Sequence, residues 1–145
     1  MTHDLPDLAS MDAFGQRIAQ VMRVGDVISL SGGLGAGKTT LARAIIAARG
    51  HRGEVPSPTF TIVEVYDDLA PRLVHADFYR LEDPSEAAEI GLDDYRDGAI
   101  LIAEWPENAG GFAQEAGCLQ ITLETVGEGR KAIVAGGAAW QERMP

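Results

Sequence analysis

A phosphate-binding loop is the first chemistry that this sequence suggests. Residues 32–39 (Gly-Gly-Leu-Gly-Ala-Gly-Lys-Thr) fit the pattern Gly, any four residues, Gly-Lys-Ser/Thr. Glycines let successive backbone N–H groups face one anion. Lys38 is expected to reach the β- and γ-phosphates of a nucleoside triphosphate, and the Thr39 hydroxyl to bind Mg²⁺. The loop residues expected to bind the nucleotide are Gly32, Gly35, Ala36, Gly37, Lys38, Thr39 and Thr40.

The segments on either side of the loop favour this interpretation over a glycine-rich turn with an incidental lysine. Residues 26–30 (Asp-Val-Ile-Ser-Leu) are typical of a buried strand, and residues 38–49 predict a helix. Strand, glycine loop and helix form the order that the motif needs. The partially positive N-terminus of the helix then points at the phosphates.

Acidic residues follow apolar segments where a phosphate-binding fold holds its metal and its attacking water. Glu104 comes directly after the apolar run 99–103, the expected position of the acid in the magnesium shell; a solvated carboxylate is the alternative. Asp77 ends a shorter strand, where it either orients water or shares the metal, or caps the next turn. His75 has no Cys or His neighbour at metal-ligand spacing, so we expect a satisfied structural histidine.

The loop 57–61 (Ser-Pro-Thr-Phe-Thr) lies where phosphate-loop proteins carry a segment that senses the γ-phosphate. A hydroxyl at Thr59 or Thr61 is expected to contact the γ-phosphate or Mg²⁺ and to order the loop when triphosphate binds. A rigid proline turn that leads into a strand is equally compatible with these residues.

Trp105 and Arg130 are further candidates in which structural and functional roles compete. Trp105 either packs near the nucleotide or covers the edge of the core. Arg130 lies in a glycine-flanked turn, where it either contacts the nucleotide or solvates the turn, and the residue pattern alone favours the turn.

The remaining segments predict an α/β domain with a P-loop NTPase-like, three-layer architecture. The strand pair 61–66 and 73–76 is close enough in sequence for an antiparallel hairpin, whereas the continuous apolar run 99–103 predicts a central strand. The sheet should therefore mix parallel and antiparallel strands. Helices are predicted at 10–23, 38–49 and 84–90 (capped by Asp83 with Glu86), and strands at 26–30, 61–66, 73–76, 99–103, 118–123 and 131–134.

Length and charge narrow the class of protein further. The 145 residues predict one domain, 1–145, with a tail from about residue 138 that is either a frayed helix or disordered. The net charge of −10 at pH 7 makes direct nucleic-acid binding unfavourable, so any link to RNA should run through a partner protein. The single cysteine, Cys118, is expected to be a buried thiol in a reducing compartment. An acidic N-terminus and the lack of a membrane-length apolar stretch predict a cytoplasmic protein.

With these pieces assembled, the sequence resembles the TsaE family, the bacterial ATPases of the tRNA threonylcarbamoyladenosine pathway. The resemblance runs from the first helix to the strand after Arg130. It rests on motifs in the right order: 35–40 (Gly-Ala-Gly-Lys-Thr-Thr), 57–61, 77–81 (Asp-Phe-Tyr-Arg-Leu) with Asp83-Pro84, and 104–107 (Glu-Trp-Pro-Glu).

The resemblance implies an ATPase, with ATP and Mg²⁺ as ligands, that joins a complex of two related proteins, TsaB and TsaD. That complex transfers threonylcarbamoyl to the adenosine beside the anticodon, and the ATPase is thought to reset it between turnovers. The resemblance implies that Lys38 binds the phosphates and that Thr39 and Glu104 bind the metal ion. It also implies that Asp77 is a catalytic carboxylate and that Trp105 is an active-site residue. Thr59 and Thr61 would form the switch that senses the γ-phosphate.

The chain departs from the family pattern at two positions. Gly33 stands where the family often has an acidic residue, and Met11 stands where a threonine is common. The second departure bears on the adenine contacts that the resemblance implies, and neither touches the residues expected to bind the triphosphate.

Other functional classes are less compatible with the residues. A small-molecule kinase usually needs an arginine-rich lid, and the arginines that follow the loop helix are scattered. A GTPase needs an Asn-Lys-x-Asp element for guanine, which is absent. A nucleotide-gated binding module with incidental hydrolysis would use the same residues as an ATPase, so only the release of phosphate separates those two hypotheses.

Overall fold

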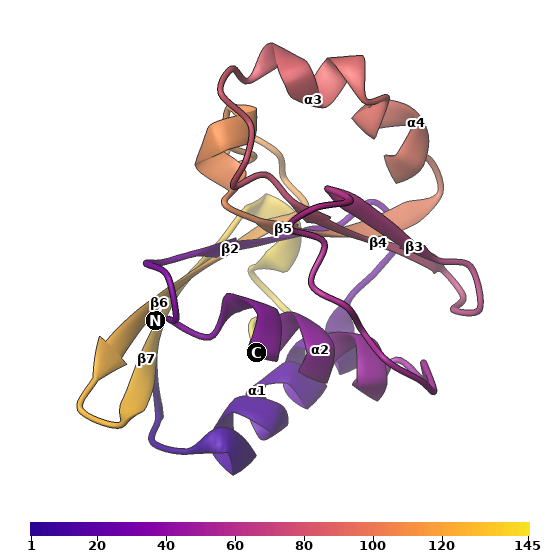
Figure 1. Cartoon of the computed structure of the whole chain (residues 1–145). Helices are drawn as coiled ribbons and strands as arrows, with labels where there is room; N and C mark the ends of the chain where they lie inside the picture. Colours follow the sequence, from indigo (N-terminus) through magenta and orange to yellow (C-terminus); the bar gives the residue numbers. More distant parts are fainter.

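A seven-stranded mixed sheet lies at the centre of the fold in a computed structural model that describes all 145 residues (Figure 1). The strands follow the order β1-β7-β6-β2-β5-β4-β3. The central strands β6, β2, β5 and β4 run parallel. At the edges, β3 pairs antiparallel with β4, β7 pairs antiparallel with β6, and β1 pairs antiparallel with β7. The bounds are β1 Thr2–Leu5, β2 Val27–Ser31, β3 Val63–Tyr66, β4 Arg72–Asp77, β5 Ala99–Glu104, β6 Cys118–Val126 and β7 Gly129–Gly136. The predicted mixed sheet is therefore confirmed.

Helices cover both faces of the sheet and complete the predicted three layers. The helices α1 (Leu8–Val21) and α2 (Lys38–Ala48) pack on one face, and the short helices α3 (Ser85–Glu89) and α4 (Leu92–Arg96) lie over the other (Figure 1). Successive residues of a strand point to opposite faces. On β5, Ile100 and Ile102 accordingly join the core under α1 and α2, while Leu101 joins the core under α3 and α4.

The register of the parallel strands brings their carboxyl ends together. Glu104 at the end of β5 pairs with Leu30 of β2 on one side and with Asp77 of β4 on the other. The segment between β2 and α2 leaves the sheet at the same edge. Ligands of open α/β sheets bind at this edge, so the topology alone places the sequence-predicted acids beside the glycine loop.

Among the strands and α-helices, two were not predicted from the sequence, and the 3₁₀ helix Pro106–Ala109 was not predicted either. The strand β1 is an edge strand of four residues that contains only one buried apolar side chain, Leu5, so it carries no alternating pattern. It pairs with β7. The helix α4 has five residues, too few for a helical period to be recognised. The strand β3 begins at Val63, two residues later than predicted, because residues 58–61 form a turn.

The end of the chain is ordered against the sheet, which corrects the expectation of a frayed or disordered tail. A short 3₁₀ helix, Ala138–Trp140, buries the Trp140 side chain completely, and its Nε1 donates to the carbonyl of Gly117. Arg143 then donates from both terminal nitrogens to the buried carboxylate of Asp26, at 2.6 and 2.7 Å. A buried aromatic and a buried ion pair therefore fix this segment. None of the helices has the length and apolar character needed to cross a membrane.

Candidate functional site

A pocket of about 330 Å³ opens where β2, β4 and β5 end, beside the glycine loop. Residues from α2, the 57–61 loop, the strand ends and the start of β7 all reach it. Its lining consists of Leu34, Gly35, Gly37, Lys38, Thr39, Thr40, Thr59, Asp77, Tyr79, Glu104, Trp105 and Arg130. Most of the residues that the sequence singled out are thus brought into one place.

The loop backbone needs glycine where the pattern has it. Gly32 and Gly37 have φ values of 138° and 102°, a region that residues with side chains rarely adopt. A Cβ on Gly32 would lie 2.4 Å from the carbonyl oxygen of Leu123. Gly37 caps α2 without a side-chain hydrogen bond, so the first N–H groups of the helix remain available to an anion. Gly32 and Ala36 shape the loop, and neither lines the pocket.

Lys38 lies in the loop as its buried cation. Its Nζ donates to the carbonyl oxygens of Gly32 and Gly33, at 2.8 and 2.7 Å, and stands 4.4 Å from the centroid of the Trp105 ring. Burial lowers the pKa of Lys38 below its usual 10.5, while the carboxylate of Glu104 and those of two other acids oppose that shift. An anion in the pocket would favour the charged form of this lysine.

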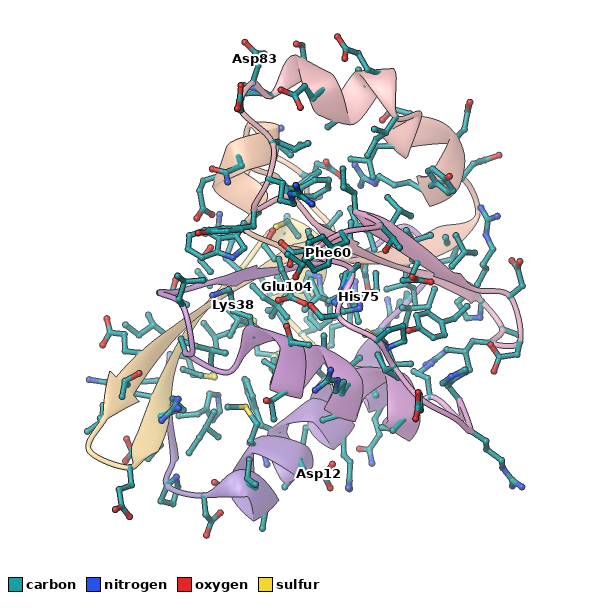
Figure 2. All side chains as sticks on the ribbon, in the orientation of Figure 1. Asp12, Lys38, Phe60, His75, Asp83 and Glu104 are labelled. Atoms are coloured by element: carbon teal, nitrogen blue, oxygen red, sulfur yellow. The ribbon has the colours of Figure 1, made fainter.

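Glu104 connects the loop helix to β4 through both of its carboxylate oxygens. The Thr39 hydroxyl donates to Oε1 at 2.8 Å, and His75 Nε2 lies 2.6 Å from Oε2. Figure 2 shows Lys38, Glu104 and His75 between the sheet and α2, whereas Asp12 and Asp83 lie far away on opposite sides of the molecule. The side chains of His75 and Glu104 are 0% and 2% exposed. His75 Nδ1 has no hydrogen-bond partner, so the expectation of a satisfied structural histidine is wrong for this atom.

Asp77 connects the pocket to the 57–61 loop. Its Oδ2 accepts a hydrogen bond from the Thr59 hydroxyl at 3.0 Å, and its Oδ1 accepts one from the backbone N–H of Tyr79. Asp77 therefore caps the next turn, which was one of its two predicted roles, and the same side chain also lines the pocket that the other role requires. Thr61 differs from Thr59, because it does not line the pocket and its hydroxyl donates to Glu64.

Trp105 and Arg130 both line the pocket. Trp105 adopts φ 54°, a left-handed conformation that is uncommon for a residue with a large side chain, and its ring lies 5.0 Å from that of Tyr79. Arg130 donates from Nε to the carbonyl of Ala36 and from Nη2 to that of Gly35, both at 3.1 Å. It therefore supports the loop rather than simply solvating its own turn.

Leu34 and Tyr79 line the pocket without having been predicted. Leu34 occupies a variable position of the loop pattern, and it is 74% exposed at the loop tip. Tyr79 could have been predicted from the sequence, since it follows Asp77 by two residues in the 77–81 motif. An aspartate at a strand end often accepts a hydrogen bond from the backbone two residues later, and here the backbone N–H of Tyr79 donates to the Asp77 carboxylate. This bond turns the chain past the pocket and brings Tyr79 to its lining.

A second, smaller pocket of about 110 Å³ adjoins the first. The two pockets share Gly37, Thr40 and Arg130 in their linings. The remaining lining comes from the β1–α1 connection, from α1 and from the β6–β7 turn: Leu5, Asp7, Leu8, Met11, Glu128 and Gly129. Of its lining, only Met11 was connected with a ligand beforehand, through the adenine contacts that the resemblance implies, because the rest of the wall depends on β1 and its pairing with β7.

The donor set of the main pocket suits one type of metal ion. No group of three or more His, Cys, Asp or Glu side chains is arranged to hold a metal. The Thr39 hydroxyl and Glu104 carboxylate instead offer hard oxygen ligands on one side of the pocket. Mg²⁺ binds proteins in this way, through one or two side-chain oxygens with phosphates and water at its other positions. These residues therefore fit magnesium.

Comparisons with known proteins agree with the fold and with the sequence motifs. A family model described as threonylcarbamoyl adenosine biosynthesis protein TsaE matches residues 5–133. The tRNA threonylcarbamoyladenosine biosynthesis protein TsaE of Haemophilus influenzae is 39% identical over 125 residues, which cover 82% of this chain and 79% of that protein. Its counterpart in Streptomyces coelicolor is 44% identical over 100 residues, covering 67% of this chain and 68% of that protein.

A solved structure extends the similarity to three dimensions. The crystal structure of Bacillus subtilis YdiB superposes with a TM-score of 0.80 at 27% identity, covering 98% of this chain and 89% of that one. The residues matched by the family model include the glycine loop and both acids at the strand ends, and the solved structure covers nearly the whole chain. The chain therefore belongs to the TsaE family of tRNA threonylcarbamoyladenosine biosynthesis proteins.

Proposed function

We propose that this protein is a Mg²⁺-dependent ATPase that serves the complex which makes threonylcarbamoyladenosine in tRNA. The observation that carries the proposal is the convergence of the glycine loop, the Thr39–Glu104 pair and the Thr59–Asp77 pair on one pocket. Each pair joins a hydroxyl to a carboxylate, and each comes from a different part of the chain. Phosphoryl transfer to water needs such groups around a bound triphosphate.

Each of these residues has its own role in the proposed hydrolysis of ATP. Lys38 and the free N–H groups at the start of α2 bind the phosphates. Thr39 and Glu104 would hold Mg²⁺, which when bound neutralises charge on the β- and γ-phosphates. Asp77 accepts a hydrogen bond from the water that attacks the γ-phosphorus, and the bond to the leaving ADP oxygen breaks to give ADP and phosphate. Thr59 ties the 57–61 loop to Asp77.

The smaller pocket is proposed to hold the adenine base. It opens from the loop at Gly37 and Thr40, and its walls include the apolar side chains of Leu8 and Met11. Apolar side chains combined with a few polar groups that fix orientation are typical of small-molecule pockets. Met11 replaces the threonine common in the family, so base contacts at this position are apolar.

The proposed partner is a TsaB–TsaD-type complex, through which the protein acts on tRNA indirectly. The loop that carries Thr59 also exposes Phe60, which is 82% exposed and stacks on Arg80. A partner that covers Phe60 would order the loop and hence Thr59 and Asp77. Hydrolysis by the isolated chain is therefore expected to be slow, and the ATP cycle is proposed to reset the complex between turnovers.

Phosphate release tests this function directly. Release is measured for the wild type and for Glu104→Ala, each alone and with the partner complex. We expect stimulation by the complex for the wild type and loss of turnover in the variant. Tight ATP binding without stimulated release would overturn the ATPase proposal in favour of a nucleotide-gated module. Transfer of phosphate to an added metabolite would instead indicate a kinase.

A further inference from the structure

His75 is a buried side chain that the proposed mechanism leaves without a role. It lies on β4 two residues before Asp77, and the sheet register pairs it with Ile102 of β5. Its side chain is fully buried, and Nε2 is 2.6 Å from Oε2 of Glu104. His75 is not part of the pocket lining, whereas Glu104 is. The imidazole thus contacts the carboxylate from the protein side, behind the pocket.

The hydrogen in this contact belongs to Nε2. His75 Nδ1 is buried without a hydrogen-bond partner. A protonated Glu104 donating to Nε2, or a doubly protonated ring, would each require a hydrogen on Nδ1, and that donor would have no acceptor. The tautomer with hydrogen on Nε2 leaves only an acceptor lone pair without a partner at Nδ1, and buries no unpaired donor, and it gives the carboxylate a donor. Glu104 Oε2 is therefore the acceptor.

The two bonds to Glu104 divide its carboxylate between two elements. Oε2 is held from β4 by His75, and Oε1 accepts the hydroxyl of Thr39 at the start of α2. A glutamate side chain has several freely rotating bonds, and fixing them has an entropic cost. A hydrogen-bond donor behind the carboxylate already fixes this side chain in the folded protein, so that binding of a ligand does not have to order it.

We propose that His75 is a positioning residue for the metal-binding pair, holding Oε2 of Glu104 so that Oε1 faces Thr39. The assignment rests on the proposed function, since it is Mg·ATP that the pair would bind. Hydrogen-bond partners behind a metal-binding side chain typically change metal affinity or activity about 10- to 100-fold when removed. Loss of His75 is therefore expected to raise the Mg²⁺ concentration needed for nucleotide binding, and to leave the metal-independent binding of the phosphates unchanged.

A structural role for His75 makes a different prediction, which a matched pair of variants separates. In His75→Gln, the amide nitrogen stands the same number of bonds from Cβ as Nε2, so the donor is kept. In His75→Met, the side chain has the same length but no donor. If His75 only filled space, the two variants would behave alike. If it positions Glu104, only the methionine variant loses function.

The measurement is the Mg²⁺ concentration that half-saturates binding of a fluorescent, non-hydrolysable ATP analogue. His75→Met should raise that concentration about 10- to 100-fold, and His75→Gln should stay close to the wild type. Binding of the analogue in EDTA should be unchanged in both, because Lys38 and the loop N–H groups do not contact His75. Circular dichroism checks the fold. Should His75→Met not fold, His75→Asn replaces it, because its amide ends one bond short of Nε2.

The outcomes separate this assignment from the proposed function. Equal Mg²⁺ requirements for His75→Met and the wild type would overturn the positioning role, as would a glutamine variant as impaired as the methionine one. A wild type that binds no nucleotide, with or without Mg²⁺, would overturn the proposed function and the assignment with it. ¹⁵N NMR of the imidazole gives an independent check without nucleotide: a hydrogen on Nε2 is expected, and a hydrogen on Nδ1 would contradict the geometry.

Discussion

Lys38 is one of only two lysines in the sequence, which provides a matched control for the phosphate site. The other, Lys131, lies on β7 and does not line the pocket. Because a charge-assisted hydrogen bond contributes about 1.5–3 kcal/mol, Lys38→Ala should weaken triphosphate binding about 10- to 100-fold. Lys131→Ala should leave it unchanged. Titration with a fluorescent ATP analogue measures both, and equal affinities for Lys38→Ala and the wild type would show that the site is misplaced.

The pH dependence of binding is a second test at the scale of this residue. Burial lowers the pKa of Lys38, so its ammonium loses the proton at a lower pH than an exposed lysine. Phosphate binds the charged form, so affinity should fall as the pH rises through that lowered pKa, and binding there should take up protons. Calorimetry in alkaline buffers of different ionisation enthalpy measures the uptake. Lys38→Arg should abolish it, and uptake that persists in this variant would assign the proton to another group.

At the scale of elements, a buried ion pair fixes the chain end together with the buried Trp140 side chain. Arg143 and Asp26 are 8% and 4% exposed at their side chains. Removing one partner of such a pair leaves an uncompensated buried charge, so Arg143→Met should lower the free energy of unfolding by about 3–5 kcal/mol. In the double variant Arg143→Met, Asp26→Asn the cost should be smaller. Urea unfolding of both variants tests this, and a double variant no more stable than the single one would contradict the role of the pair.

The elements that sequence reasoning found are those with strong local signals. The apolar run of β5 and the glycines of the loop fix their own conformations, which explains why the sequence alone pointed to Lys38, Thr39 and Glu104, three residues that line one pocket in the structure. β1 and the Trp140 segment have no such pattern, because their structure comes from β7 and from the Gly117 carbonyl, far away in sequence. The contact between His75 and Glu104 has the same origin. It depends on the register of β4 against β5, which no local pattern encodes.

At the scale of the whole molecule, the fold separates the pocket that is proposed to bind phosphate from an acidic surface. The layer that contains α3 and α4 carries a run of carboxylates: Glu82, Asp83, Glu86, Glu89, Asp93, Asp94 and Asp97. Lys38, which is proposed to bind phosphate, and Arg130 lie in or beside the glycine loop, where both donate to its carbonyl groups. A small anionic ligand would therefore meet only the local charge of this site, whereas a long polyanion would meet a net charge of −10.

The isolated chain should accordingly show no measurable binding to tRNA at physiological ionic strength. Affinity for nucleic acid comes largely from phosphate contacts by lysine and arginine, and this surface would add repulsion instead. Fluorescence anisotropy of labelled tRNA, titrated with the protein alone and then with the partner complex, measures the difference. Binding is expected only when the partner is present. Tight binding by the chain alone, weakening steeply with salt, would require a basic surface that the charge distribution does not provide, and it would contradict an indirect role on tRNA.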